Sequence, residues 1–279
     1  MSLMPLGSTD AWSGWIGRAD RVTQVLEPTL LRQFAAAIGE SLDVEHRWPT
    51  LGHWAYFHTI VATDQLSDDG HPRRGDFYPP ITLKRRMFAA AEIEFHRALV
   101  LNEAATLTSR IIDIRRRQGR QGDLVIVDVE RSIEQLGASC LRETQSIIYR
   151  DARDPGTALA EVPATADPED AIWQPSPVDL FRFSAATSNS HRIHYDVLYA
   201  TTVESYPALV VHGPLTAAKL CAYATTRQGG VAAKFRFRAL APIFVSQPVR
   251  LRQRAATGQV CALRCDGSVA MEATIEFMD

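Results

Sequence analysis

The spacing of apolar residues predicts that the chain begins with helices. Residues 26–41 have a helical period, with Pro28 near the start and a shared apolar face made by Leu30, Leu31, Phe34 and Ile38. The aromatic-rich residues 48–61 predict a second helix, and residues 67–86, rich in proline and glycine, predict a long loop. A loop of that length in a compact protein is usually functional or disordered.

The pattern then changes to the short alternating or apolar runs that are typical of strands. In the first half these runs are residues 91–99, 106–117, 123–135 and 139–150, with a hairpin turn expected at 118–122. In the second half a helix is predicted at 213–226, followed by strands at 234–239, 248–255, 259–266 and 269–278.

The two halves repeat one plan. The segment "LLRQFAAAIGE" resembles "LFRFSAATSNS", and strand, break, strand patterns follow both. Two copies of a helix wrapped by an antiparallel sheet are the simplest explanation, which predicts an α+β protein. We expect a first unit at 1–152, a linker rich in proline, alanine and acidic residues at 153–172, and a second unit at 173–279.

Composition narrows the function classes. The 279 residues are 46% hydrophobic and 22% charged, which is enough for a packed core. Because 30 Lys and Arg nearly balance 32 Asp and Glu, we expect no nucleic-acid partner. The four cysteines lack zinc-site spacing and are expected to be reduced. Without an apolar run of membrane length or a secretory signal, we expect a cytoplasmic protein with no membrane insertion.

The segment "SAATSNSHRIHYD" (184–196) concentrates polar groups between two apolar stretches. It holds five candidate site residues, Asn189, His191, Arg192, His194 and Asp196. Burying so many hydrogen-bonding groups is costly unless they find partners, so this segment is a candidate site rather than a solvated loop.

The longer string "FSAATSNSHRIHYDVLYATTVESYPALVVHGPL" resembles the hydratase 2 motif of MaoC-like (R)-specific enoyl-CoA hydratases. It is more similar to one branch of that superfamily, the type 2 hydroxyacyl-thioester dehydratases and mesaconyl-C4-CoA hydratases. In the first half, "LKRRMFAAAEIEFHRAL" and "GRQGDLVIVDVERSI" also resemble that branch. The resemblance covers residues 25 to 279 and implies a double hotdog fold, with two helix-in-sheet units in one chain.

The resemblance implies reversible hydration of a 2-enoyl thioester. His194 matches the general acid/base and Gly213 the oxyanion-hole glycine at the start of a helix. Asn189 stands where the family has its catalytic aspartate; an amide cannot carry the proton but can orient water. Asp196 is expected either to hold the imidazole tautomer or to cap the next helix, and His191 either to bind substrate or to pack.

The expected partner is an acyl-CoA or acyl-carrier-protein thioester, with coenzyme A as part of the substrate, no other cofactor, no metal, and a homodimer as one possible assembly. A second substrate carboxylate could be bound by three candidate arginines, Arg192, Arg85 and Arg86, which favours a short dicarboxylic acyl chain as the substrate. Alternatively these arginines face solvent or the CoA phosphates.

Two other functions remain open from the sequence: a hotdog thioesterase and a non-catalytic acyl-CoA-binding module. We expect catalysis to be confined to the second unit, because "FAAAIGE" in the first contains no histidine. The long loop at 67–86 is expected to shape the acyl pocket.

Overall fold

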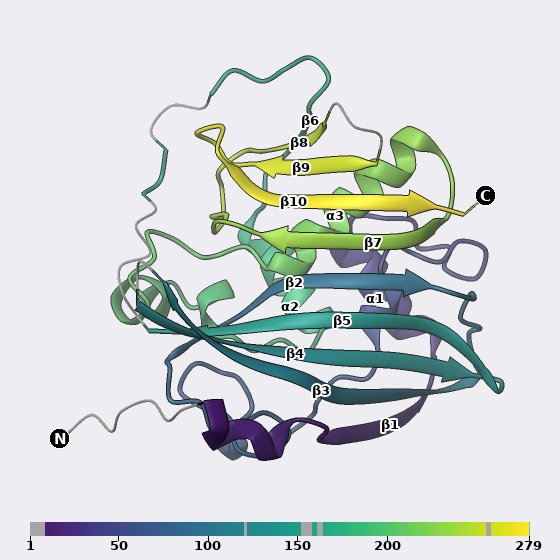
Figure 1. Cartoon of the computed structure of the whole chain (residues 1–279). Helices are drawn as coiled ribbons and strands as arrows, with labels where there is room; N and C mark the ends of the chain where they lie inside the picture. Colours follow the sequence, from purple (N-terminus) through teal and green to yellow (C-terminus); the bar gives the residue numbers. More distant parts are fainter. Residues whose placement is uncertain (1–8, 120–121, 152–157, 161–163, 255–257, 279) are drawn as a thin grey trace.

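The computed structural model describes residues 9–119, 122–151, 158–160, 164–254 and 258–278. Its strands form one sheet in the order β1-β3-β4-β5-β2-β7-β10-β9-β8-β6, and every pairing is antiparallel (Figure 1). The strands are β1 (Ala19–Val25), β2 (Arg85–Phe95), β3 (Ala104–Gly119), β4 (Gly122–Gln135), β5 (Ala138–Arg150), β6 (Ala171–Trp173), β7 (Ala232–Ala239), β8 (Val249–Gln253), β9 (Gln259–Leu263) and β10 (Val269–Phe277).

The two halves meet where β2 pairs with β7, with Ala90 opposite Arg238. The sheet is therefore continuous from the first half to the second. The predicted strands are confirmed, although β2 begins at Arg85, six positions before the predicted start at 91, so it includes two of the three candidate arginines, Arg85 and Arg86. The short strand β6 lies at the end of the predicted linker and pairs with β8. Linker residues 152–157 and 161–163, and turn residues 120–121, lie outside the described residues.

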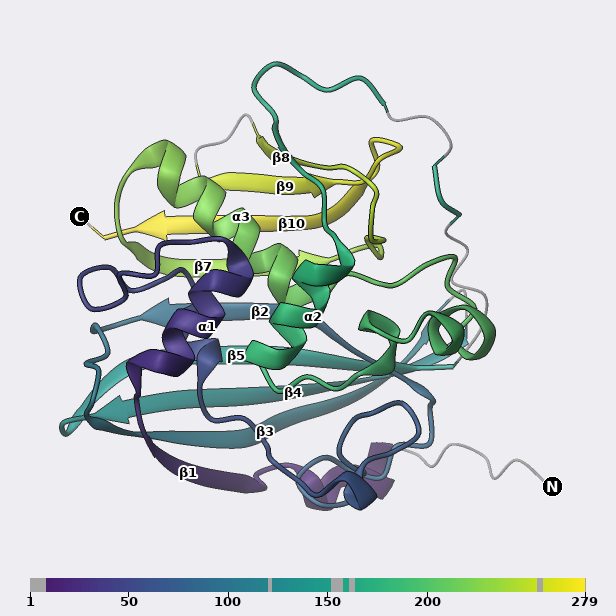
Figure 2. The same cartoon turned by 180° about the vertical axis from the view of Figure 1, so that it is seen from behind.

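Three helices lie on one face of this sheet: α1 (Pro28–Ile38), α2 (Pro177–Ala186) and α3 (Gly213–Gln228) (Figure 2). α1 ends at Gly39, whose left-handed φ of 73° suits glycine. α2 starts with a capping box between Ser176 and Asp179. α1 and α2 pack together, with the rings of Phe34 and Phe183 5.9 Å apart, so the similar segments noted in the sequence become packed partners. No helix in the described part of the chain is long and apolar enough to cross a membrane.

The predicted second helix at 48–61 is wrong. Only a single 3-10 turn, Gly52–Ala55, forms there; Tyr56 after it is extended and Phe57 has a positive φ of 60°. The aromatic residues are buried, as a core segment requires, but Pro49 and Gly52 interrupt the helix and Leu51 has a positive φ of 54°. In this half no helix among the described residues corresponds to α3; the buried Trp54 packs instead against Phe88 and Phe237.

Candidate functional site

The polar segment predicted to be a site lies between α2 and α3. It forms a turn after α2, then a 3-10 helix at Arg192–His194. The Oδ1 atom of Asn189 accepts a hydrogen bond from the backbone N–H of His191 at 3.1 Å. The amide side chain thereby shapes the turn that places His191 and His194, and its role toward a water molecule stays a prediction.

His194 is buried and held in one orientation. Its Nδ1 lies 2.7 Å from the carbonyl oxygen of Val210, so the proton is on Nδ1 and Nε2 is left as an acceptor. Burial lowers the pKa of His194 to about 4, against the smaller opposing effect of the Val210 carbonyl. A neutral imidazole with a bare Nε2 is the form that can take a proton from substrate.

His212, the residue before α3, packs against the ring of His194. The ring of His212 stacks on that of His194 with centroids 3.6 Å apart. The hydroxyl of Ser184 lies 2.9 Å from Nε2 of His212, while Nδ1 of His212 is buried without a hydrogen-bond partner among the described residues. Burial lowers the pKa of His212 well below its usual value, so this ring is neutral too.

Gly213 is the first residue of α3, where main-chain N–H groups have no carbonyl partner within the helix. A Cβ at this position would lie 3.2 Å from the carbonyl oxygen of Phe88 on β2. The glycine therefore lets a strand of the first half approach the helix start closely. A thioester oxygen placed at this end would meet N–H donors and the positive end of the helix dipole.

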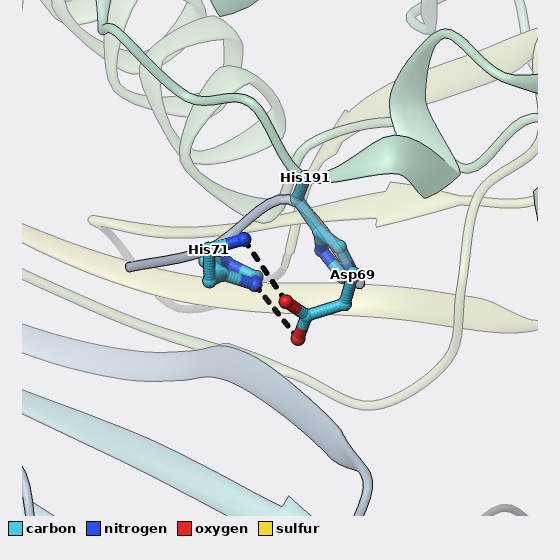
Figure 3. Close-up of side chains that lie close together, drawn as sticks. All are labelled: Asp69, His71 and His191. Carbon is cyan, nitrogen blue, oxygen red and sulfur yellow. Dashed lines mark hydrogen bonds and ion pairs between the residues drawn. The ribbon is translucent and has the colours of Figure 1, made fainter. Parts of the chain in front are cut away.

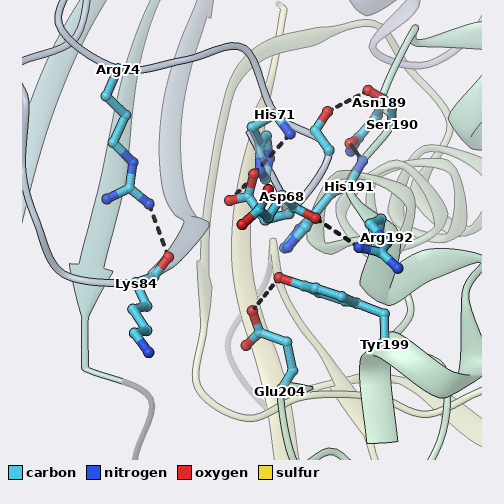
Figure 4. Close-up of polar contacts among 12 residues, drawn as sticks. Asp68, His71, Arg74, Lys84, Asn189, Ser190, His191, Arg192, Tyr199 and Glu204 are labelled. Atoms are coloured by element: carbon cyan, nitrogen blue, oxygen red, sulfur yellow. Dashed lines mark hydrogen bonds and ion pairs between the residues drawn. The ribbon is translucent and has the colours of Figure 1, made fainter. Parts of the chain in front are cut away.

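The loop at 67–86 docks onto the motif through its main chain. The carbonyl oxygen of Asp69 accepts from the N–H of Arg192 at 2.9 Å, and that of Gly70 accepts from the Ser190 hydroxyl at 2.5 Å. Gly70 has a φ of 89°, and a Cβ there would lie 1.9 Å from the Ser190 carbonyl oxygen, so only glycine fits. Figure 4 shows the loop residues Asp68 and His71 beside the motif residues.

This docking brings a carboxylate and an imidazole from the first half into the site (Figure 3). Asp69 accepts from the backbone N–H of His71 at 2.9 Å, and its other oxygen lies 3.2 Å from Nδ1 of His71. The His71 ring lies 4.2 Å from that of His191, which lies edge-on 5.3 Å from His194. Four imidazoles thus contact one another in sequence, His71, His191, His194 and His212.

His71 and Asp69 were not singled out from the sequence. The signal available was the string "DDGHP" inside a long loop, which has turn chemistry but no spacing that links it to a motif 120 positions later. Burial lowers the pKa of His71, which Asp69 partly offsets. Burial alone would raise the pKa of Asp69, but the hydrogen bonds and charge of His71 outweigh it, so the pKa is lowered.

Asp69, His71 and His191 each offer a ligand atom, and these atoms lie within 4.8 Å of one another. They suit a metal ion poorly. Burial is the largest cause that lowers the pKa of His71 and of His191, and for His191 the charge of His71 comes next. The guanidinium of Arg86 lowers the pKa of both imidazoles further, and Arg74 lowers that of His71 as well. A field that disfavours a proton on these rings also disfavours a divalent cation.

The three candidate arginines have different surroundings. Arg85 is buried and its Nε lies 2.8 Å from Oε2 of Glu204. Arg192 is more exposed and pairs with Asp196 at 2.8 Å, one helical turn away. Asp196 Oδ1 also accepts a hydrogen bond from the backbone N–H of Tyr199 at 3.0 Å, so Asp196 caps the following turn.

Of the three candidate arginines, Arg86 is the one whose charge, after burial, contributes to the lowered pKa of His71 and of His191. Its guanidinium lies over the ring of Tyr78 at 4.4 Å. Burial would lower the pKa of Arg86, but Tyr149, Tyr78 and Asp69 together raise it, so the group is a permanent cation. The hydroxyl of Tyr149 is buried without a hydrogen-bond partner among the described residues, which leaves a donor beside this cation.

Comparisons with known proteins identify the family of this chain. The family model of hydroxyacyl-thioester dehydratase type 2 matches residues 48–245. The chain is 40% identical to mesaconyl-C(4)-CoA hydratase of Chloroflexus aurantiacus over 281 residues, which cover 97% of this chain and 99% of the relative.

Among solved structures, a MaoC-like dehydratase from Phytophthora capsici is similar with a TM-score of 0.70, at 13% identity over 98% of each chain. A Mycobacterium tuberculosis protein described as having a double hotdog fold is similar with a TM-score of 0.54, at 12% identity over 93% of this chain and 95% of that one. At such identities the likeness concerns the fold, and the expected α+β double hotdog is confirmed.

Proposed function

The chain belongs to the hydroxyacyl-thioester dehydratase type 2 family, and from that premise we propose that it hydrates a short dicarboxylic enoyl-CoA such as a mesaconyl- or itaconyl-type thioester. The family and the full-length similarity to a hydratase make it a hydro-lyase acting on a CoA thioester. They favour this activity over a thioesterase or a non-catalytic acyl-CoA-binding module.

The proposed roles follow the geometry. His194, with Nδ1 held by Val210, gives a proton from Nε2 to the α-carbon in hydration and takes it back in dehydration. The N–H groups at Gly213 stabilise the thioester oxygen as it gains enolate character. His191 and Asn189 fix the turn between them. Coenzyme A enters as part of the substrate, and the proton transfers require side chains alone.

The observation that carries the dicarboxylic preference is the position of Arg86. In a mesaconyl-C4 thioester, the β-carbon attacked by water itself bears a carboxylate. The cation that binds this carboxylate must therefore lie beside the proton-transfer groups rather than at the end of an acyl tunnel. Tyr149, whose buried hydroxyl offers a donor, lies opposite Arg86 on the neighbouring strand. After burial, the charge of Arg86 lowers the pKa of both His71 and His191.

The test compares kcat/KM for mesaconyl-C4-CoA and crotonyl-CoA, which lacks the carboxylate. Arg86→Ala is expected to lower kcat/KM for mesaconyl-C4-CoA on the order of 10²-fold, because it leaves a buried carboxylate unpaired. Crotonyl-CoA should be affected much less. Lys84→Gln, an exposed change two positions away, is the matched control, and Arg192→Ala tests the solvent-side arginine.

If crotonyl-CoA is the better substrate of the unaltered protein, or if Arg86→Ala weakens both substrates equally, the dicarboxylic proposal fails. Loss of the enoyl-thioester absorbance should occur without thiol release. Thiol release would instead indicate a thioesterase, and binding with neither signal would indicate a binding module.

Two further expectations from the sequence stay proposals, a cytoplasmic location and a homodimer. Light scattering on the purified protein tests the dimer.

A further inference from the structure

The site contains a carboxylate–imidazole pair for which the roles above have no use. Asp69 and His71 come from the first half, and the loop that carries them is fixed to the motif by hydrogen bonds from Arg192 and Ser190. At the motif position where the family has aspartate, this chain has Asn189, whose Oδ1 is engaged by a backbone N–H. The site thus has an amide at that position and a carboxylate that comes from a distant loop.

We infer that His71, oriented by Asp69, is the second proton-transfer group of the hydration site and handles the proton of the water at the β-carbon. The inference rests on the proposed hydratase function. With Nδ1 directed at Asp69, Nε2 is the His71 nitrogen that exchanges the proton. Asp69 is a positioning residue, because it holds the tautomer and stabilises the imidazolium of His71 without reaching the substrate.

The order of the groups matches the order of atoms in the substrate. The rings contact in the sequence His212, His194, His191, His71, from the start of α3 to the loop that runs on into β2, where Arg86 is the second residue. A substrate with its thioester oxygen at Gly213 and its carboxylate at Arg86 places the α-carbon nearer His194. It places the β-carbon, where water adds, nearer His71.

In the dehydration direction, Nε2 of His194 takes the proton from the α-carbon, and the electron pair left behind forms the double bond. The bond between the β-carbon and oxygen breaks, and the leaving hydroxide takes a proton from Nε2 of His71 to depart as water. Hydration reverses each transfer. The histidine pair carries one proton throughout, which starts on His71 in dehydration and on His194 in hydration.

The charged and titratable groups that face His71 set its response to pH. They are Asp69, which favours the imidazolium, and Arg74, Arg86, His191 and His194, which oppose it. A substrate carboxylate on Arg86 offsets that cation, so the bound substrate itself promotes the protonated form of His71.

The experiment measures kcat, KM and the pH profile of dehydration for full-length His71→Gln, Asp69→Asn and Asp69→Glu. His71→Gln should lower kcat on the order of 10²-fold with KM nearly unchanged. Asp69→Asn should move the alkaline limb of the kcat profile to lower pH, because the imidazolium loses its carboxylate. Asp69→Glu should return the limb toward its original position. Asp68→Asn, an exposed neighbour, is the matched control and should change neither value.

A fall in kcat for Asp69→Asn without a shift of the limb would mean that the pair is structural and would overturn the inference. So would His71→Gln with unchanged kcat. If the unaltered protein hydrates neither mesaconyl-C4-CoA nor crotonyl-CoA, the proposed function itself has failed. Turnover lost on treatment with EDTA and restored by zinc would assign Asp69, His71 and His191 to a metal instead, which also overturns it.

Discussion

The first half of the molecule contains two histidine–carboxylate pairs, one in its own core and one at the boundary with the second half, and the two pairs differ in what else surrounds them. In the first half, Glu143 on β5 accepts from Nε1 of Trp54 at 3.1 Å and from Nε2 of Gln145 at 2.9 Å, and lies 3.4 Å from Nε2 of His53. In the site between the halves, Asp69 holds one nitrogen of His71, and the His71 ring opens onto other imidazoles.

The pair of Glu143 and His53 stabilises the fold, whereas the pair of Asp69 and His71 belongs to the proposed site. Burial alone would raise the pKa of Glu143, but His53, Arg131 and Gln145 lower it, so this carboxylate is an anion fully engaged by its neighbours. It occupies the region where the first half has a single turn instead of a counterpart to α3. The first half thus uses this buried pair to stabilise a core that lacks a counterpart to α3, while its loop carries Asp69 and His71 to the site.

The largest expected effect on turnover is that of a change at His194, in the proposed site. His194→Ala should lower turnover by roughly 10²–10⁴-fold, the scale of a lost general acid/base, while the protein stays folded. Steady-state kinetics and circular dichroism check it. His46→Ala, an exposed histidine of the first half, is the control; an equal loss there, or an active His194→Ala, would remove the contrast.

On the structural side, Glu143→Ala should destabilise the fold by about 1–3 kcal/mol for each donor left buried and unpaired, because it removes the carboxylate that accepts from Trp54 and Gln145. Turnover of the folded fraction should be retained. Urea unfolding measures the free energy, with the exposed Glu134→Ala on the neighbouring strand as the control. A stable but inactive Glu143→Ala protein would place this pair in the chemistry after all.

The third prediction concerns pH. The pKa of His194 is lowered by burial to about 4, below the 6.5 of an unfolded chain, so the folded state binds fewer protons between these values. The contribution of His194 to the free energy of unfolding is therefore fully present above pH 6.5. It is lost as the pH falls toward 4, which lowers the free energy of unfolding by about 3 kcal/mol.

His71, His191 and His212 act in the same direction, since burial lowers the pKa of each. Unfolding free energies across this pH range should be flatter for His194→Gln than for the unaltered protein. Parallel curves would show that the row of imidazoles is not the source of the acid sensitivity.

The smallest expected effect belongs to Asn189. Asn189→Ala removes one hydrogen bond that shapes the turn before His191, worth about 1 kcal/mol. We expect turnover to fall by about tenfold, less than for His194→Ala. If Asn189→Ala is the more damaging of the two changes, the amide rather than the imidazole carries the chemistry and the assigned roles are reversed.

Periodicity predicted the helix at 28–38, the strands of both halves and the helix that starts at Gly213, because one-sided burial leaves its mark on each of these segments. The helix predicted at 48–61 is wrong, because the aromatic residues there are apolar for burial around Glu143 and not for one face of a helix. His194 and Gly213 were found because a contiguous motif carries them. Asp69 and His71 were not, since only the docking of Gly70 on Ser190 brings that loop to the motif.

The central claim is that the two halves build one proton-transfer site. A double-mutant cycle of His71→Gln and His194→Gln, read as kcat for mesaconyl-C4-CoA hydration, tests it most directly. Because both groups act in one reaction, the double variant should be about as slow as the slower single variant. If the fold-losses of the two single variants multiply in the double variant, the histidines act independently and the claim is contradicted.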